Sequence, residues 1–177
     1  MAGTSLLGAW SPFAPVNDED KQLFKSAVRL LGVDYTPLLA AKQVVDGLQY
    51  LFVCNARIVI PNTKEYGVVV RVYLPVGEKS EVEVTRIGHP HFVGAFGAFA
   101  PVDETEKKAL AEAVGVGVDW APLYATVQIV AGRNILYAAN AKVVYPDAPT
   151  YPVFVKVYQP LEGKPQLTSV TDAWDWK

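Results

Sequence analysis

The sequence predicts an α+β protein of two tandem domains, each with one helix packed on a four- to five-stranded antiparallel sheet. Three observations predict this: an internal repeat, one helical stretch in each copy, and strand-like alternation after each helix. Gln43 recurs as Gln128, 85 positions later. A period of this size divides the 177 residues into two units, each near the small end for an independent domain. We therefore expect domains at residues 1–88 and 89–177.

Each copy contains one predicted helix with a capping signature. Asn17 and Asp103 stand at the N-cap positions and are followed by acidic residues, which offset the helix dipole. Apolar residues then recur at helical spacing, and glycines follow as stops. We expect helices near 18–31 and 104–114. The repeat offset is 86 before the helices and 85 after them, so we expect one residue to be missing from the second helix.

The chain after each helix is strand-like. Between residues 48 and 60, alternation places Tyr50, Phe52 and Cys54 on an apolar face and Asn55 on the other. The arm before each helix is expected to add a short strand, and residues 87–91 to form the joint between the copies. The predicted strands of the first copy are 38–45, 48–60, 68–74 and 80–86, and the second copy repeats them as far as 166–170.

Composition and charge exclude several classes of function. Sixteen basic and 18 acidic residues give a formal charge of −2 with no basic stripe, so we expect no nucleic-acid partner. No apolar run approaches the roughly 18 residues of a membrane span, so we expect no membrane partner. No signal peptide is visible and one cysteine cannot form an intramolecular disulfide. We therefore expect a cytoplasmic protein, with secretion as the alternative.

Residues that could carry chemistry have simpler interpretations. Cys54 aligns with Ala139 in the second copy, which predicts a small core position for both. His89 and His91 are the only histidines, and Pro90 between them predicts a linker. The acidic clusters are accounted for by the helix starts. We therefore expect no enzyme activity, no catalytic residue, no metal and no cofactor.

Aromatic residues near the two ends of the sequence suggest additional packing. Trp10 and its counterpart Phe96 are expected to cover one end of each sheet. Trp174 and Trp176 have no equivalent in the first copy. They could cover an exposed edge or mediate assembly, but packing back on their own domain is the favoured interpretation.

The pattern Gln-x-Val-x-Gly occurs once in each copy, between two predicted strands and after the helix. Alone it is a short motif, but its recurrence at matched places is a stronger signal. It resembles the cystatins, inhibitors of papain-like cysteine proteases, and the resemblance covers nearly the whole chain twice. The later stretch 157–168 is similar to the second hairpin of the stefins, the small cystatins without disulfides. The two copies of the motif are Gln43-Val44-Val45-Asp46-Gly47 and Gln128-Ile129-Val130-Ala131-Gly132.

The resemblance implies a function and a set of binding residues. In cystatins, an N-terminal arm and two hairpin loops form a wedge that enters the active-site cleft of the protease. The implied partner is therefore a papain-like cysteine protease. The positions that match the wedge are Gly8, Gln43 to Gly47, Pro75 and Val76 in the first copy, and Gly94, Gln128 to Gly132, Pro160 and Leu161 in the second.

Two departures from the family pattern keep a second hypothesis open. Asp46 places a carboxylate at the first loop, where burial against a protease costs desolvation. The second loops at Pro75 and Pro160 lack the Pro-Trp pair of many secreted cystatins. The alternative is a non-inhibitory binding or structural module, which burial of both first loops between the halves would favour. The active copy, the arrangement of the copies and the oligomeric state stay open.

Overall fold

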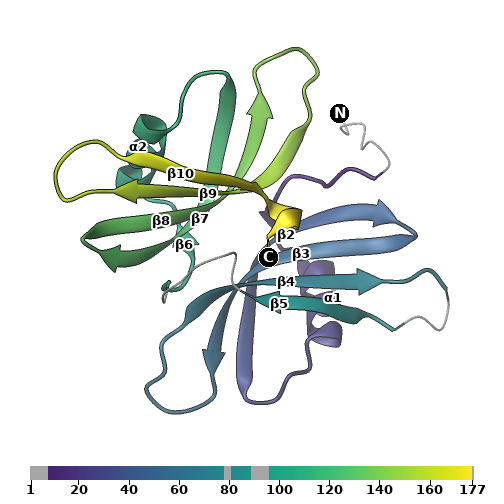
Figure 1. Cartoon of the computed structure of the whole chain (residues 1–177). Coiled ribbons are helices and arrows are strands. Elements are labelled where there is room, and N and C mark those ends of the chain that lie inside the picture. The colour runs from purple at the N-terminus through teal and green to yellow at the C-terminus, as the bar shows by residue number, and fades with distance from the viewer. Residues whose placement is uncertain (1–7, 78–80, 89–95, 177) are drawn as a thin grey trace.

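A computed structural model describes residues 8–77, 81–88 and 96–176 (Figure 1). It contains two five-stranded antiparallel sheets, each with one helix packed on it, which confirms the predicted fold class. Each sheet pairs its strands in chain order. The first half comprises β1 (Ala14–Pro15), α1 (Asp18–Ala27), β2 (Val33–Val45), β3 (Gly47–Ile58), β4 (Tyr66–Leu74) and β5 (Glu83–Gly88). The second half comprises β6 (Ala100–Pro101), α2 (Glu104–Ala113), β7 (Val118–Val130), β8 (Gly132–Val143), β9 (Thr150–Gln159), β10 (Gln166–Asp172) and the 3-10 turn η1 (Ala173–Asp175).

Both helices begin as the sequence predicts. Asn17 accepts a hydrogen bond from the Asp20 amide at 2.8 Å, and the Asp20 carboxylate accepts one from the Asn17 amide at 3.1 Å. Asp103 and Glu106 form the same reciprocal pair at the start of α2. These capping boxes satisfy amides that the first turn leaves without partners. The short strands β1 and β6 confirm that the arm before each helix joins its sheet.

The end of the first helix differs from the prediction. α1 ends at Ala27 instead of residue 31, and both helices have ten residues. Leu31, the last residue of the predicted helix, is 99% exposed because it lies in the turn that leads to β2. Gly32 in this turn has a φ of +86°, which glycine adopts without strain. The residue missing from the second copy is therefore missing from the helix-to-strand connection, not from the helix.

The central strands β3 and β8 are buried on both faces, whereas alternation predicted one apolar face. Phe52 and Cys54 pack beneath α1, while Leu51 and Val53 of the same strand face the other half of the molecule. All four side chains are fully buried. A continuous apolar run is typical of strands covered on both sides.

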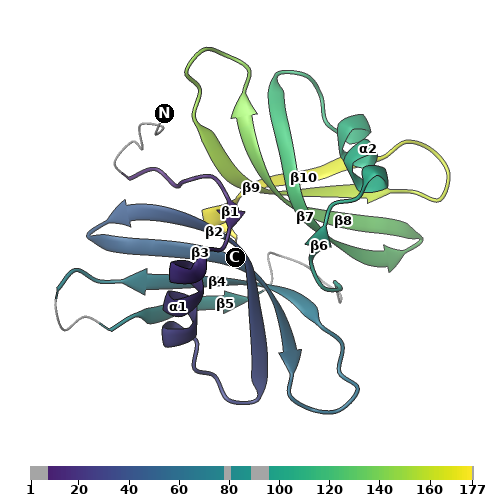
Figure 2. The same cartoon turned by 180° about the vertical axis from the view of Figure 1, so that it is seen from behind.

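One apolar cluster joins the two halves. It contains residues of both sheets and both arms, and Trp10 and Phe96 are among its members. The two sheets and their helices are seen from behind in Figure 2. The buried members are Trp10, Phe13, Leu39, Ala41, Leu51, Val53, Val69, Phe96, Phe99, Leu136, Ala138, Phe154, Ala173 and Trp176.

The two arms cross between the halves through a repeated pair of hydrogen bonds. Asn140 of β8 accepts from the Phe13 amide at 2.7 Å and donates to the Phe13 carbonyl at 2.9 Å. Asn55 of β3 binds Phe99 in the same way and at the same distances. Each asparagine thus satisfies both polar groups of one arm residue from the opposite half. This reciprocity fixes how the halves are placed.

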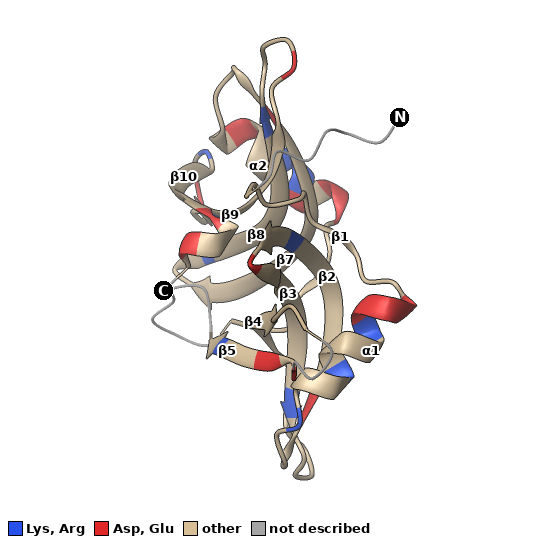
Figure 3. Ribbon diagram, turned by 90° about the vertical axis from the view of Figure 1, so that its right-hand side faces the viewer, with Lys and Arg blue, Asp and Glu red and all other residues tan. Residues whose placement is uncertain are grey.

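Charges are distributed over both halves. In Figure 3, acidic and basic residues are interspersed, and the acidic first turn of α1 is followed by lysines along the helix. None of the helices in the described part of the chain is long and apolar enough to cross a membrane. The predicted joint spans residues 87–91. Residues 87 and 88 are the last two of β5, and residues 89–91 lie outside the described residues. The predicted domain boundary between 88 and 89 therefore falls where the described part of the first half ends.

Candidate functional site

Each half presents an apolar tip where two hairpins meet. The first tip consists of residues 43–47, in the β2–β3 turn, together with Pro75 and Val76 after β4. Val44 and Val45 are 46% and 40% exposed, and Val76 is 75% exposed. None of these tip residues belongs to the cluster that joins the halves. The predicted binding residues of the first copy therefore lie together and face solvent.

Gly47 brings the two hairpins of the first tip into contact. Its φ is +122°, and a Cβ there would lie 2.4 Å from the Leu74 carbonyl oxygen and 3.2 Å from Pro75 Cα. Any other residue would strain the backbone and collide with the neighbouring strand. The last residue of the motif is thus a structural requirement for the close approach of the hairpins.

A tyrosine fastens the tip from the neighbouring strand. The Tyr73 hydroxyl on β4 donates a hydrogen bond to the Asp46 carbonyl at the turn of the first hairpin. The second half repeats this bond between the Tyr158 hydroxyl on β9 and the Ala131 carbonyl. Tyr73 and Tyr158 are separated by the same 85 positions as the two motifs, but the sequence analysis does not assign them to the site. Their recurrence at the motif offset, on the strand beside it, was the available signal.

The arm of the first half lies alongside the first tip. The Gln43 side chain donates to the Gly8 carbonyl at 2.7 Å, and Trp10 forms a β-bridge with Gln43. Ser11 and Lys42 then exchange two hydrogen bonds, of 2.7 Å from the Ser11 amide and 2.9 Å from the Lys42 amide. The first residue of the motif therefore holds the arm glycine, and the three predicted parts of the wedge are adjacent in this half.

The second tip repeats this geometry with different side chains. Ile129 is 79% exposed, Val130 43% and Leu161 84%. Gly132 has a φ of +105°, and a Cβ there would lie 2.4 Å from the Gln159 carbonyl oxygen and 3.0 Å from Pro160 Cα.

The arm of the second half also follows its tip. The Gly97 amide donates to the Val127 carbonyl at 3.3 Å, the counterpart of the bond from Ser11 to Lys42. The Thr126 hydroxyl donates to the Gly97 carbonyl at 2.6 Å. Gly94, the predicted wedge glycine of this half, lies outside the described residues.

The two tips differ in charge. Asp46 is exposed at the turn of the first tip, where the second tip has Ala131. The second tip carries Arg133, whose Nε donates to the Gln159 side chain at 2.7 Å. The first tip therefore has an acidic apex, and the second has a guanidinium beside an apolar apex.

The tips lie at opposite sides of the molecule. The β2–β3 hairpin ends at the right of Figure 1 and the β7–β8 hairpin ends at the left. The view from behind shows the same separation (Figure 2). A large partner on one tip would therefore leave the other accessible.

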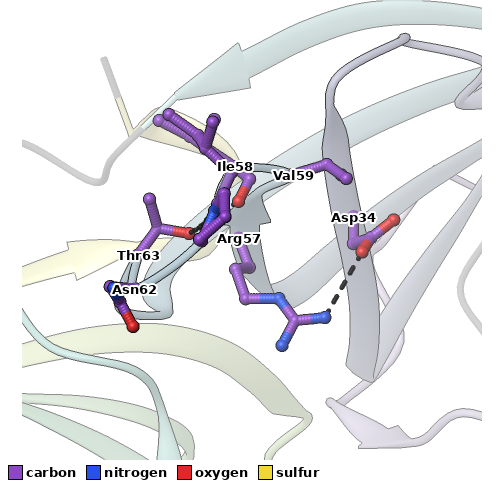
Figure 4. Close-up of a pocket in the computed structure, with 8 residues that line it drawn as sticks. Asp34, Arg57, Ile58, Val59, Asn62 and Thr63 are labelled. Carbon is purple, nitrogen blue, oxygen red and sulfur yellow. Dashed lines mark hydrogen bonds and ion pairs between the residues drawn. The ribbon is translucent and has the colours of Figure 1, made fainter.

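A hollow of about 280 Å³ lies at the other end of β3 (Figure 4). It is lined by residues 57–63 and Asp34. Asp34 and Arg57 form an ion pair of 3.5 Å with both side chains more than half exposed, and such pairs contribute little stability. The Thr63 hydroxyl closes the loop by donating to the Ile58 carbonyl at 2.6 Å. These interactions account for the loop structure, and we assign the hollow no chemistry.

Cys54 is a core residue, as the repeat predicts. It is fully buried beneath α1, and burial raises the pKa of its thiol well above the usual value. A buried, protonated thiol is a poor nucleophile. Among the described residues, no group of three or more His, Cys, Asp and Glu side chains is placed to hold a metal ion. His89 and His91 lie outside the described residues.

Comparison with known proteins gives no assignment of this geometry. No protein-family model matches the chain, and no curated protein is similar to it in sequence.

Proposed function

We propose that the protein is a tandem cystatin-like inhibitor of papain-like cysteine proteases, with one wedge in each half. One observation carries the proposal: in each half the Gln-x-Val-x-Gly turn is fixed against the next hairpin by a glycine and a tyrosine, with its apolar residues exposed. The order of the elements, a helix after a short first strand and then four antiparallel strands, agrees with the resemblance.

The geometry suits binding in a cleft. The hydrogen bonds from Tyr73 and Tyr158 hold each turn before a partner arrives, so little conformational freedom is lost on binding. Branched side chains such as Val45 and Val130 present apolar surface with few rotamers to restrict. Inhibition of this kind blocks the cleft sterically and involves no covalent step.

The alternative proposal is a non-inhibitory module that binds another protein or serves a structural role. Asp46 favours it for the first half, because its carboxylate must lose water in any closed interface. Both turns are exposed, however, and neither is used to join the halves. This arrangement supports the inhibitor for the second half most strongly.

The charge difference makes the tips selective in different ways. The first tip favours a cleft that offers a lysine or arginine to Asp46, since an unpaired buried carboxylate is costly. The second tip, with Ala131 at its apex, favours an apolar entrance. We therefore propose that papain-like proteases distinguish the two halves.

The test is inhibition of papain by the intact protein and by variants of each tip. Val130→Asp should abolish inhibition by the second tip, and Val45→Asp should abolish inhibition by the first. Both side chains are at least 40% exposed, so the fold should tolerate these changes. Full inhibition by a folded double variant would contradict the assignment of the tips, and no inhibition by the unaltered protein would favour the alternative module.

A further inference from the structure

The segment Ala173–Trp176, here called the Trp segment, crosses from the second half to the first. Its end lies on β5, where the Trp176 ring is 2% exposed and a Cβ at Gly88 would come within 3.0 Å of it. The Arg86 guanidinium lies 4.6 Å from the centre of the Trp176 ring. The favoured expectation that this segment packs back on its own domain is therefore incomplete, because both tryptophan rings contact the first half.

Trp174 contacts the arm of the first half directly. Its ring is parallel to that of Trp10, with the centres 6.4 Å apart. Arg71 of β4 joins both residues: its guanidinium lies 5.9 Å from the centre of the Trp10 ring and donates a hydrogen bond to the Trp174 carbonyl. Stacked aromatic rings and a guanidinium over a ring face attract one another, so these contacts favour the docked position of the arm.

The arm in turn reaches the first tip. Trp10 forms its β-bridge with Gln43, and the Gln43 side chain holds the Gly8 carbonyl. A continuous series of contacts therefore leads from Trp174 through Trp10 to the residue that opens the first turn. The arm of the second half is held differently, because the Gly97 carbonyl accepts a hydrogen bond from the Gly67 amide at 3.0 Å.

We propose that the Trp segment is a positioning element for the first tip alone: Trp174 fixes Trp10, and Trp10 holds the arm against Gln43. The proposal rests on the proposed function for its consequence, since a displaced arm weakens the first wedge. The contact itself is independent of any protease. The arm of the first tip is thus controlled by a residue of the opposite half.

The test uses Trp174→Ala in the full chain, with two readouts. The first is hydrogen exchange at the Ser11 and Lys42 amides, which are bonded only while the arm is docked, with the Gly97 amide as the matched control. We expect faster exchange at Ser11 and Lys42, no change at Gly97, and substantial recovery in Trp174→Phe. Unchanged exchange at Ser11 and Lys42, or equal acceleration at Gly97, would overturn the proposal.

The second readout is papain binding by one tip at a time. With the second tip disabled by Val130→Asp, Trp174→Ala should weaken binding about tenfold, the effect of losing roughly one stacking contact. With the first tip disabled by Val45→Asp, it should leave binding unchanged, and an equal loss at both tips would overturn the proposal. If papain binds neither tip, the proposed function fails, and the contrast in exchange rates alone decides for or against the positioning role.

Discussion

Gly47 and Gly132 determine how closely the two hairpins of each tip approach. Each combines a positive φ with a neighbouring carbonyl oxygen at the place where a side chain would begin. The motif glycine could be predicted from the sequence as a turn residue. Its contact with the next hairpin could not, because nothing local in the motif indicates which strand follows beside it.

Replacing either glycine by alanine should destabilise the protein by roughly 1–3 kcal/mol, from backbone strain and the collision with the neighbouring strand. It should also weaken binding at the altered tip. Urea denaturation measures the loss of stability, and Gly115→Ala is the matched control because no atom lies near its Cβ position and its φ is not positive. A Gly47→Ala variant as stable as Gly115→Ala would contradict this account.

Tyr137 anchors α2 and makes the second half sensitive to alkali. Its hydroxyl, on β8, donates to the Glu106 carbonyl at 2.7 Å, and its ring is fully buried. Burial, with a smaller contribution from Glu106, raises the pKa of Tyr137 above its usual value of 10.0. Because the native state keeps a proton that the unfolded state loses, this contribution is fully present below pH 10 and decreases as the pH rises above it.

Tyr137→Phe should therefore flatten the alkaline decline in stability while lowering stability near neutrality by about 1 kcal/mol, through loss of one hydrogen bond. Phe52 occupies the equivalent position of the first half, so a phenylalanine ring is compatible with this core. Denaturation at a series of pH values between neutrality and pH 11 measures both effects. A decline as steep as in the unaltered protein would show that Tyr137 is not the group responsible.

The arms are the elements that unite the halves. Each lies beside its own tip, contributes two aromatic residues to the shared cluster and enters its own sheet as β1 or β6. The sequence predicted an extended arm and a short strand. It did not predict that each arm binds an asparagine of the other half, because alternation places Asn55 on a polar outer face, and Asn140 is its counterpart in the second copy.

Asn55→Ala should destabilise the protein by about 2–3 kcal/mol, because it leaves the amide and carbonyl of Phe99 without partners in a buried place. Asn140→Ala should have a smaller effect, since Asn140 is partly exposed while Asn55 is 8% exposed. Urea denaturation of both variants gives the comparison, and faster exchange of the Phe99 amide in Asn55→Ala gives a local check. Equal and negligible effects would show that the arms are held by apolar packing alone.

At the scale of the whole molecule, the sequence predicts the fold of each half better than the interface between the halves. Capping boxes, the repeat and strand alternation are local signals, and they gave the helix starts and the strand order. Leu51 and Val53 are apolar at positions that alternation assigned to an outer face, and this was the available sign of a second buried surface. The surface that covers Leu51 and Val53 is formed by residues far away in the sequence, such as Phe154. No local sequence pattern links these residues to one another.

The shared cluster also determines how function should be measured. Separation into residues 1–88 and 89–177 would expose the apolar surface of both sheets and remove each arm from its asparagine. Such halves should associate with one another or aggregate, since exposed apolar surfaces of this kind form interfaces. Binding by each tip is therefore measured in the intact chain, with the other tip disabled by a single substitution.

The most direct test of the account is the stoichiometry of the complex between the intact protein and papain, measured by light scattering after size-exclusion chromatography. Because the two tips are exposed at opposite sides of the molecule, the account predicts two papain molecules per chain. Val45→Asp or Val130→Asp should leave one, and the double variant none. A well-folded protein that forms no complex with papain, or a complex unaffected by both substitutions, would contradict it.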